Sequence, residues 1–300
     1  MPAIAVEILE SVHQHRVLTA RQIRALHMPA ASLRWAQRIL THLQKGRLIE
    51  QARGPRGVAL WFLTAHGADT IEAGGTLAEW RRRVSTPAQA AGPLRAHTLA
   101  VNDTGIAFVN AARERPGDDC GPLAWRHEIA HPCSPPRGRS ATHLVIADAL
   151  ISYLQAAPDD SLILHQRFIE LDRGTIPVDT LARKLARYAA VRDYRADATK
   201  EPSWRAYYRA FPAVLVVLAS QGGAPARRRI AKTIALYASD PGRGRHGPVA
   251  ISFTTLPELR ARGPFAPVFI NAEHPGHPVD WLGQVQTTRG RNAGELPEGW

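Results

Sequence analysis

The feature that most constrains the fold of this chain is an apolar-rich run at residues 162–171 that brings two acids, Glu170 and Asp172, to its end. Such a run predicts a buried strand. Because residues i and i+2 of a strand point to the same face, the two carboxylates are expected side by side. A second strand-like run, residues 143–151, carries Asp148 in its middle. Three carboxylates from two neighbouring strands suit a hard divalent cation, Mg²⁺ or Mn²⁺.

The charge of the chain indicates what such a site would act on. The 300 residues carry a formal net charge of +12, so nucleic acid is the leading partner and an anionic membrane surface the second. Metal-dependent chemistry on a phosphate backbone is the resulting hypothesis. The longest apolar run, residues 211–219, is too short to span a bilayer, so no membrane insertion is expected. Two cysteines make no disulfide framework, which favours a reducing cytoplasm.

Residues 1–75 have the pattern of a winged helix. Apolar residues recur at helical spacing in residues 4–12, 20–27 and 33–45. Thr19 and Ser32 are suitable N-caps for the second and third of these helices, and Gly46 ends the third. Two strand-like runs around a Gly-rich turn would form the wing, followed by a closing helix, at residues 48–52, 58–63 and 64–73.

In a winged helix the third helix enters the major groove of double-stranded DNA. The predicted DNA contacts are five residues on the outward side of this helix and two on the wing: Arg34, Gln37, Arg38, His42, Lys45, Arg53 and Arg56. Residues 1–95 hold thirteen basic and six acidic residues, so they carry +7 of the net charge, which favours DNA contact. A solvated basic face and a protein-binding winged helix are the alternatives.

The remainder of the chain predicts a second domain, and the length suffices for each domain to have its own core. Residues 76–93 are rich in Ala, Pro and Gly and contain three consecutive arginines, which predicts a basic linker. Residues 94–283 alternate in the order helix, three strands, helix, strand, helix, strand, a mixed α/β architecture. The apolar strand at residues 211–220 is expected in the centre of its sheet. Residues 284–300 are polar and are expected to form a loose tail.

This order of elements resembles the restriction-endonuclease fold, whose motif is Asp … (Asp/Glu)-x-Lys; Asp148 matches the first acid and Glu170 the second. Over about residues 5–220 the chain more specifically resembles the replication-relaxation family of plasmid and mobile-element proteins. The matching segments are HTLAVND at 97–103, WRHE at 125–128, IADA at 146–149, ELDRGT at 170–175 and RKLARY at 183–188. That family is similar to the MobC class of relaxases, which nick plasmid DNA at a transfer origin. The resemblance therefore implies a nicking enzyme with partners in a transfer or replication complex.

The chain departs from the nuclease motif at two positions. Ala147 replaces the usual Pro before the first acid, and Asp172 stands where a Lys usually follows the second acid. A cation beside the attacking water is thus missing from the strand. Lys184, on the following predicted helix, is expected to supply it, as some nuclease variants place their Lys there.

The resemblance implies a role for each residue of the site. Asp148, Glu170 and Asp172 would hold one Mg²⁺ or Mn²⁺, which polarises the scissile phosphate and activates the nucleophile. Lys184 would stabilise charge that develops on the phosphoryl oxygens. Glu128, from the preceding strand, would complete or orient the cluster. The alternative is that these acids form ordinary ion pairs with neighbouring arginines, in a DNA-binding protein of replication or transcription control that does not cleave.

Two further patterns compete with this interpretation. His127-Glu128-x-x-His131 matches the zinc-protease pattern, but that chemistry needs a helix, and Pro132 follows at once. A zinc site formed by Cys120, His127, His131 and Cys133 is a second alternative. Tyr188 is either a covalent nucleophile in a nicking reaction or a core residue, because its spacing from Lys184 fits both.

Overall fold

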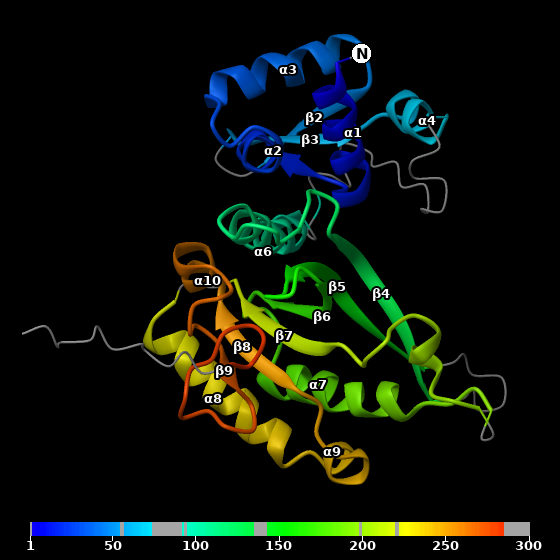
Figure 1. The fold of residues 1–300 in the computed structure, drawn as a ribbon, viewed down its shortest axis with the longest axis vertical. Helices are drawn as coiled ribbons and strands as arrows, with labels where there is room; N and C mark the ends of the chain where they lie inside the picture. The colour runs from blue at the N-terminus through cyan, green and yellow to red at the C-terminus, as the bar shows by residue number, and fades with distance from the viewer. Residues whose placement is uncertain are drawn as a thin grey trace, which may run out of the picture.

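The structure is a computed structural model that describes residues 2–54, 57–73, 92, 95–134, 143–197, 200–219 and 222–284. Arg56, nearly all of the predicted linker and the predicted tail beyond Gln284 lie outside these ranges. The described chain is mixed α/β, with one three-stranded and one six-stranded sheet (Figure 1).

The first part of the chain, here called the N-terminal module, packs helices around the small sheet. Its elements are α1 (Ala3–His15), β1 (Leu18–Thr19), α2 (Ala20–His27), α3 (Leu33–Lys45), β2 (Ile49–Arg53), β3 (Ala59–Leu63) and α4 (Ala65–Ala73). The three strands are antiparallel in the order β1-β3-β2. The predicted bounds of α2 and α3 are confirmed, because local capping decides them. Thr19 forms a capping box with Gln22, and Ser32 accepts a hydrogen bond from the Trp35 amide.

The second part is built on the large sheet, whose strands lie in the order β4-β5-β6-β7-β8-β9. Strands β6, β7 and β8 run parallel, and the other neighbours are antiparallel. The strands are β4 (Trp125–Ser134), β5 (His143–Ala156), β6 (Leu162–Asp172), β7 (Ala213–Leu218), β8 (Ile251–Thr255) and β9 (Ile270–Asn271). As predicted, β7 is buried and lies inside the sheet, between β6 and β8.

Helices cover both faces of this sheet (Figure 1). On one face lie α6 (Arg95–Arg113) and α10 (Leu256–Arg262), and on the other α7 (Val178–Asp193) and α8 (Ala224–Ala238), with η2 (Ser203–Ala206) and α9 (Pro241–His246) beside α7. The short helices α9 and α10 were not predicted from the sequence. Strand β5 also runs five residues beyond its predicted end, forming a long hairpin with β6 whose apolar residues Leu162 and Leu164 are exposed.

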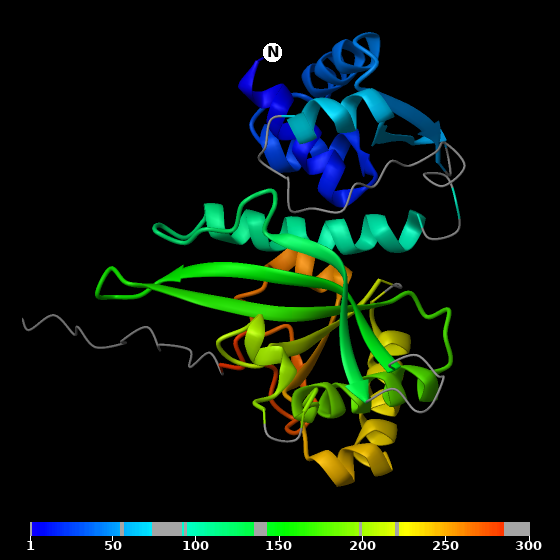
Figure 2. The ribbon, with the colours of Figure 1, turned by 90° about the vertical axis from the view of Figure 1, so that its right-hand side faces the viewer.

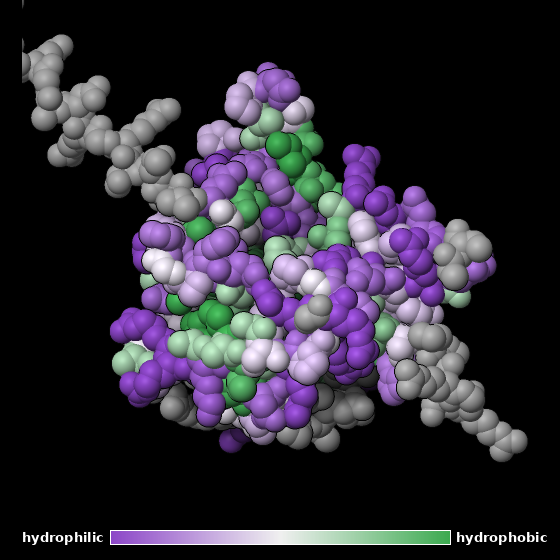
Figure 3. All heavy atoms as spheres, turned by 90° about the horizontal axis from the view of Figure 1, so that it is seen from below, coloured by the Kyte–Doolittle hydropathy of each residue, from purple (hydrophilic) through white to green (hydrophobic). Residues whose placement is uncertain are grey.

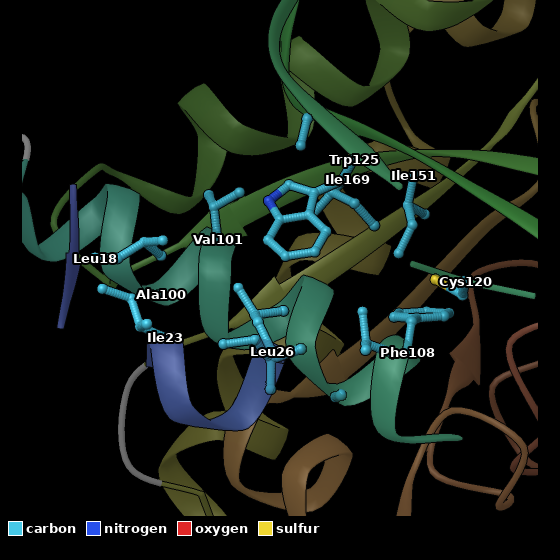
Figure 4. Close-up of a cluster of buried hydrophobic side chains, with 14 of the residues drawn as sticks. Leu18, Ile23, Leu26, Ala100, Val101, Phe108, Cys120, Trp125, Ile151 and Ile169 are labelled. Atoms are coloured by element: carbon cyan, nitrogen blue, oxygen red, sulfur yellow. The ribbon is translucent and has the colours of Figure 1, made fainter. Parts of the chain in front are cut away.

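Helix α6 lies between the N-terminal module and the large sheet and is buried on both sides (Figures 1 and 2). Figure 4 shows side chains of the module, of α6 and of the sheet in a single buried cluster that includes Leu18, Ile23, Leu26, Ala100, Val101, Phe108, Trp125, Ile151 and Ile169. The expectation of a separate core for each part is therefore corrected: the module and the α6 face of the sheet share one core.

Polar contacts accompany this shared core. The Asn102 side chain, which is fully buried, donates to the Val17 carbonyl at 3.0 Å, and Gln22 Nε2 donates to Asp103 Oδ1 at 2.8 Å. The His15 ring stacks on Trp125 with centroids 3.9 Å apart. Because buried polar groups are costly unless paired, these contacts hold the module in one orientation on the sheet.

We expect this interface to be sensitive to acid. Burial lowers the pKa of His15 to about 3 and keeps the pKa of His127, 3.4 Å away, well below its ordinary value. The unfolded chain therefore binds more protons than the folded one below pH 6.5. The free energy of unfolding should fall as pH decreases from 6.5 toward 3, by about 1.4 kcal/mol per pH unit for each imidazole. Urea unfolding at several pH values measures this slope. His15→Gln should reduce this slope by about 1.4 kcal/mol per pH unit, the contribution of one imidazole. An unchanged slope would contradict the conclusion that His15 contributes to the acid sensitivity.

Figure 3 views the molecule from the side away from the N-terminal module, and that face is mostly hydrophilic, with hydrophobic residues in separate groups. Within the described ranges, none of the helices has the length and apolar character needed to cross a bilayer.

Candidate active site

Asp148 lies where strands β5 and β6 separate. Side chains before it, such as Ala147, pack on the α7 side of the sheet, whereas Ala149 packs on the α6 side, so the alternation of β5 breaks at Asp148. The ladder between the strands ends at the pair Ala149 and Ile169. Beyond it, Asp148 Oδ2 accepts a hydrogen bond from the Leu171 amide at 2.7 Å. The Asp148 carboxylate thus takes the place of a backbone acceptor and is held between the two strands.

Glu170 lies on β6 with its carboxylate turned toward α7. Its side chain is only 3% exposed, and its two oxygens accept hydrogen bonds from Lys184 Nζ and the Tyr188 hydroxyl, each at 2.5 Å. Lys184 and Tyr188 are four residues apart on α7, so they share one face of that helix. The spacing that the sequence shows thus delivers both donors to one buried acid.

Lys184 is shared between the two acids, since its Nζ also lies 3.9 Å from Asp148 Oδ1. Burial, aided by the charge of Asp148, raises the pKa of Glu170 to about 8, although Lys184 and Tyr188 oppose this shift. Burial also disfavours ionised Asp148, but the His97 hydrogen bond, the Lys184 charge and the Leu171 amide outweigh it and lower the Asp148 pKa. The surroundings therefore favour the ionised form of Asp148 and the protonated form of Glu170, and the two acids share the Lys184 ammonium.

Asp172 does not join this pair, which corrects the expected convergence of three acids. Its side chain is fully buried and is held by Arg229 of α8, with Nε 2.5 Å and Nη2 3.0 Å from its two oxygens. Oδ1 also accepts from the Gly174 amide at 2.8 Å. In the part of the chain that the structure describes, no group of three His, Cys, Asp or Glu side chains is placed to hold a metal ion.

Glu128 lies on β4 between the pairs His127–Ala149 and Ile129–Ala147, so its backbone lies opposite Asp148 of β5. Arg16 of the N-terminal module contacts both Glu128 carboxylate oxygens, at 2.7 and 2.5 Å. Both residues have positive φ, 54° for Glu128 and 68° for Arg16, a backbone conformation that non-glycine residues rarely adopt. The Glu128 carboxylate thus forms an ion pair between the module and β4, and its expected role beside the acid pair stays a prediction.

The zinc-protease interpretation is wrong, because residues 127–131 lie on strand β4 rather than on a helix. The His127 ring faces His15 in the shared core, whereas the His131 ring bonds to the Tyr208 hydroxyl at 2.8 Å beyond the opposite face of the sheet. The four-residue zinc site is not formed either: Cys120 is buried in the cluster around α6, and Cys133 contacts Arg187.

The predicted DNA-contacting residues of α3 form one exposed surface. Arg34, Gln37, Arg38, His42 and Lys45 line a shallow hollow together with Thr41. Arg34, Arg38 and Lys45 have no ion-pair partner among the described residues, so their charges are available to a ligand. Arg53, also exposed, ends β2, and the predicted contact Arg56 falls outside the described residues.

Two residues that were not predicted to contact the acids do so in the structure. His97, in the first turn of α6, has Nε2 3.3 Å from Asp148 Oδ1. Tyr188 is 1% exposed and donates to Glu170, so its hydroxyl is not open to a substrate. The only sequence signal for His97 was its place in the HTLAVND segment, which says nothing about its contact.

A family model described as replication-relaxation matches residues 9–202, about two thirds of the chain. The match runs from within α1 to the residue before η2, so it includes α3, Asp148, Glu170 and Lys184. No curated protein and no solved structure matches the chain significantly.

Proposed function

We propose that this chain, which belongs to the replication-relaxation family, binds double-stranded DNA of a plasmid or mobile element and nicks one strand with the help of a divalent metal ion. In this proposal the N-terminal module is a winged helix, and the large sheet with its helices is a restriction-endonuclease-like domain similar to that of MobC-class relaxases. The observation that carries the proposal is the group of Asp148, Glu170 and Lys184, brought together from β5, β6 and α7.

The acid pair fits a magnesium or manganese ion. Magnesium is commonly bound through one or two carboxylates, the remaining positions being filled by water and substrate phosphate. Asp148 and Glu170 supply two such carboxylates around one position that a lysine ammonium now approaches. Burial, aided by the charge of Asp148, raises the pKa of Glu170 to about 8, and a divalent cation bound at the pair would oppose this shift. Asp172 does not fit as a ligand, because Arg229 occupies both of its oxygens.

Each residue of the proposed site would have a separate role. Asp148 and Glu170 hold the ion, which when bound polarises the scissile phosphate. Lys184 lies beside them and stabilises negative charge on the phosphoryl oxygens. Tyr188 keeps Glu170 oriented and is too buried to attack phosphorus, so water is the nucleophile in this proposal. The exposed α3 surface holds the duplex, and proteins of a transfer or replication complex are the expected partners.

Supercoiled DNA carrying the origin region of the element tests the proposal. The wild-type protein should convert it to the nicked form with Mg²⁺ or Mn²⁺, but not with EDTA. The Asp148→Ala/Glu170→Ala double variant should bind the DNA without nicking it. If the wild type binds in a salt-dependent way but never nicks, the non-catalytic alternative, a DNA-binding control protein on this scaffold, replaces the proposal.

Binding of DNA by α3 has its own test. Each lost phosphate contact should reduce the slope of log K against log salt by about 0.9, so Arg34→Ala/Arg38→Ala should lower it by about 2 and weaken binding for all sequences. Fluorescence anisotropy at several salt concentrations measures both quantities. Arg227→Ala/Arg228→Ala, two exposed arginines on α8, is the matched control. Equal slopes for wild type and the α3 variant would rule out this surface as the DNA contact.

A further inference from the structure

His97 is the one imidazole described in contact with the acid pair, and the proposed function gives it no role. It lies in the first turn of α6, and its Nε2 is 3.3 Å from Asp148 Oδ1. The other Asp148 oxygen, Oδ2, accepts from the Leu171 amide at 2.7 Å. Each oxygen of Asp148 therefore faces a donor, one from the backbone and one from the imidazole. The orientation of the carboxylate is fixed by these two contacts rather than by free rotation.

The position of His97 is in turn fixed by the N-terminal module. Within the two turns of α6 that follow His97, the Leu99 carbonyl accepts from Gln22 at 2.9 Å, Asp103 accepts from the same amide, and Asn102 donates to Val17. A rotation or shift of α6 that moved His97 away from Asp148 would break these contacts with the module. His97 therefore projects from a helix that is packed against the module on one side and against the sheet on the other.

We propose that His97 is a positioning residue, which holds Asp148 in the orientation that binds the divalent ion and ties that orientation to the docking of the N-terminal module. This inference rests on the proposed function, because the orientation of Asp148 matters only if the acid pair holds a metal. The side chain of His97 is 28% exposed and that of Asp148 is 20% exposed, so the contact lies at the entrance to the pair rather than deep in the core. Hydrogen-bond donors to a ligating carboxylate typically contribute 10–100-fold to metal affinity.

Titration of DNA-free protein with Mn²⁺, followed by electron paramagnetic resonance, tests the inference without relying on activity. His97→Ala should weaken Mn²⁺ binding by about 10–100-fold. His97→Gln should stay within about threefold of wild type, because its side-chain amide nitrogen reaches a position close to Nε2 and still donates. His165→Ala is the matched control: it removes a partly exposed imidazole from β6 that bonds to Gln155 at 2.9 Å, within the β5–β6 hairpin. DNA affinity should be the same in all three variants.

Several outcomes would overturn the inference. Wild-type Mn²⁺ affinity in His97→Ala would show that the contact has no effect on Asp148. Equal weakening in His97→Gln and His97→Ala would show that the imidazole acts otherwise than as a donor. Failure of the wild type to bind Mn²⁺ would remove the proposed metal site and this inference together. Mn²⁺ binding without nicking of DNA would remove the proposed catalytic function alone, and the affinities of the variants would still decide the role of His97.

Discussion

On the proposed function, replacement of Lys184 by Ala should reduce the rate of DNA nicking by about 10²–10³-fold while leaving the binding of metal intact. The Lys184 ammonium is the cation that the structure places within 2.5 Å of Glu170 and 3.9 Å of Asp148. A preorganised charge at a reacting phosphate typically contributes 10²–10³-fold to the rate. Its removal also takes a positive charge away from the metal position, so the affinity for Mn²⁺ should stay level or rise.

The comparison of Lys184→Ala with Arg183→Ala makes this prediction specific. Arg183 is the preceding residue of α7, but it is exposed and pairs with Asp179 at 2.8 Å, away from the acids. Single-turnover nicking at saturating DNA and metal should be slow for Lys184→Ala and near wild type for Arg183→Ala. Nicking at the wild-type rate by Lys184→Ala would mean that Lys184 only neutralises buried acids. Loss of Mn²⁺ binding would mean that it organises the site instead of acting on the phosphate.

Replacement of Arg229 by Ala should lower the free energy of unfolding by about 3–5 kcal/mol, the cost of leaving a buried charge without its partner. The Asp172 side chain is fully buried, and Arg229 contacts both of its oxygens. The Gly174 amide would be its one remaining donor among the described hydrogen bonds. Urea unfolding measures the loss, and Arg228→Ala, an exposed neighbour on the same helix, should change stability by less than about 0.5 kcal/mol.

The double variant Asp172→Asn/Arg229→Met distinguishes structure from catalysis. Removal of both charges should recover part of the stability lost in Arg229→Ala, because no buried charge is left without a partner, although the amide nitrogen introduced at position 172 loses its partner. Since Asp172 is not part of the acid pair, this variant should also keep the wild-type affinity for Mn²⁺. A stable double variant that no longer binds Mn²⁺ would restore Asp172 as a metal ligand.

Those parts of the fold that local chemistry decides were predictable from the sequence. Helix α2 begins at the capping residue Thr19, and β6 follows its apolar run to Asp172, because capping and periodicity act over a few residues. Helix α10 begins at an equally suitable cap, Thr255, which accepts from the Glu258 amide, but its seven residues give too short a periodic signal to be recognised.

Pairings between distant residues were not predictable in the same way. Glu170 and Lys184 are 14 residues apart and lie on consecutive elements, so the expected approach of Lys184 to the acids could be derived from the order of strand and helix. The partner of Asp172 comes from 57 residues farther along the chain, and that of Glu128 from 112 residues earlier. Spacing placed the acids on their strands but carried no information about which distant arginine each would meet.

The shared core around α6 has a consequence for where a strand would be cut. A nuclease whose DNA-binding domain is joined to its catalytic domain by a flexible linker can cut at a range of distances from the sequence it recognises. Here α6 is packed by the module on one side and by the sheet on the other, and Asn102 and Asp103 join it to the module. On the proposed function, the distance between the bound DNA site and the cut is therefore fixed at a constant number of base pairs. Base pairs inserted between the two would move the cut to a different sequence, because the protein could not stretch to reach the original one.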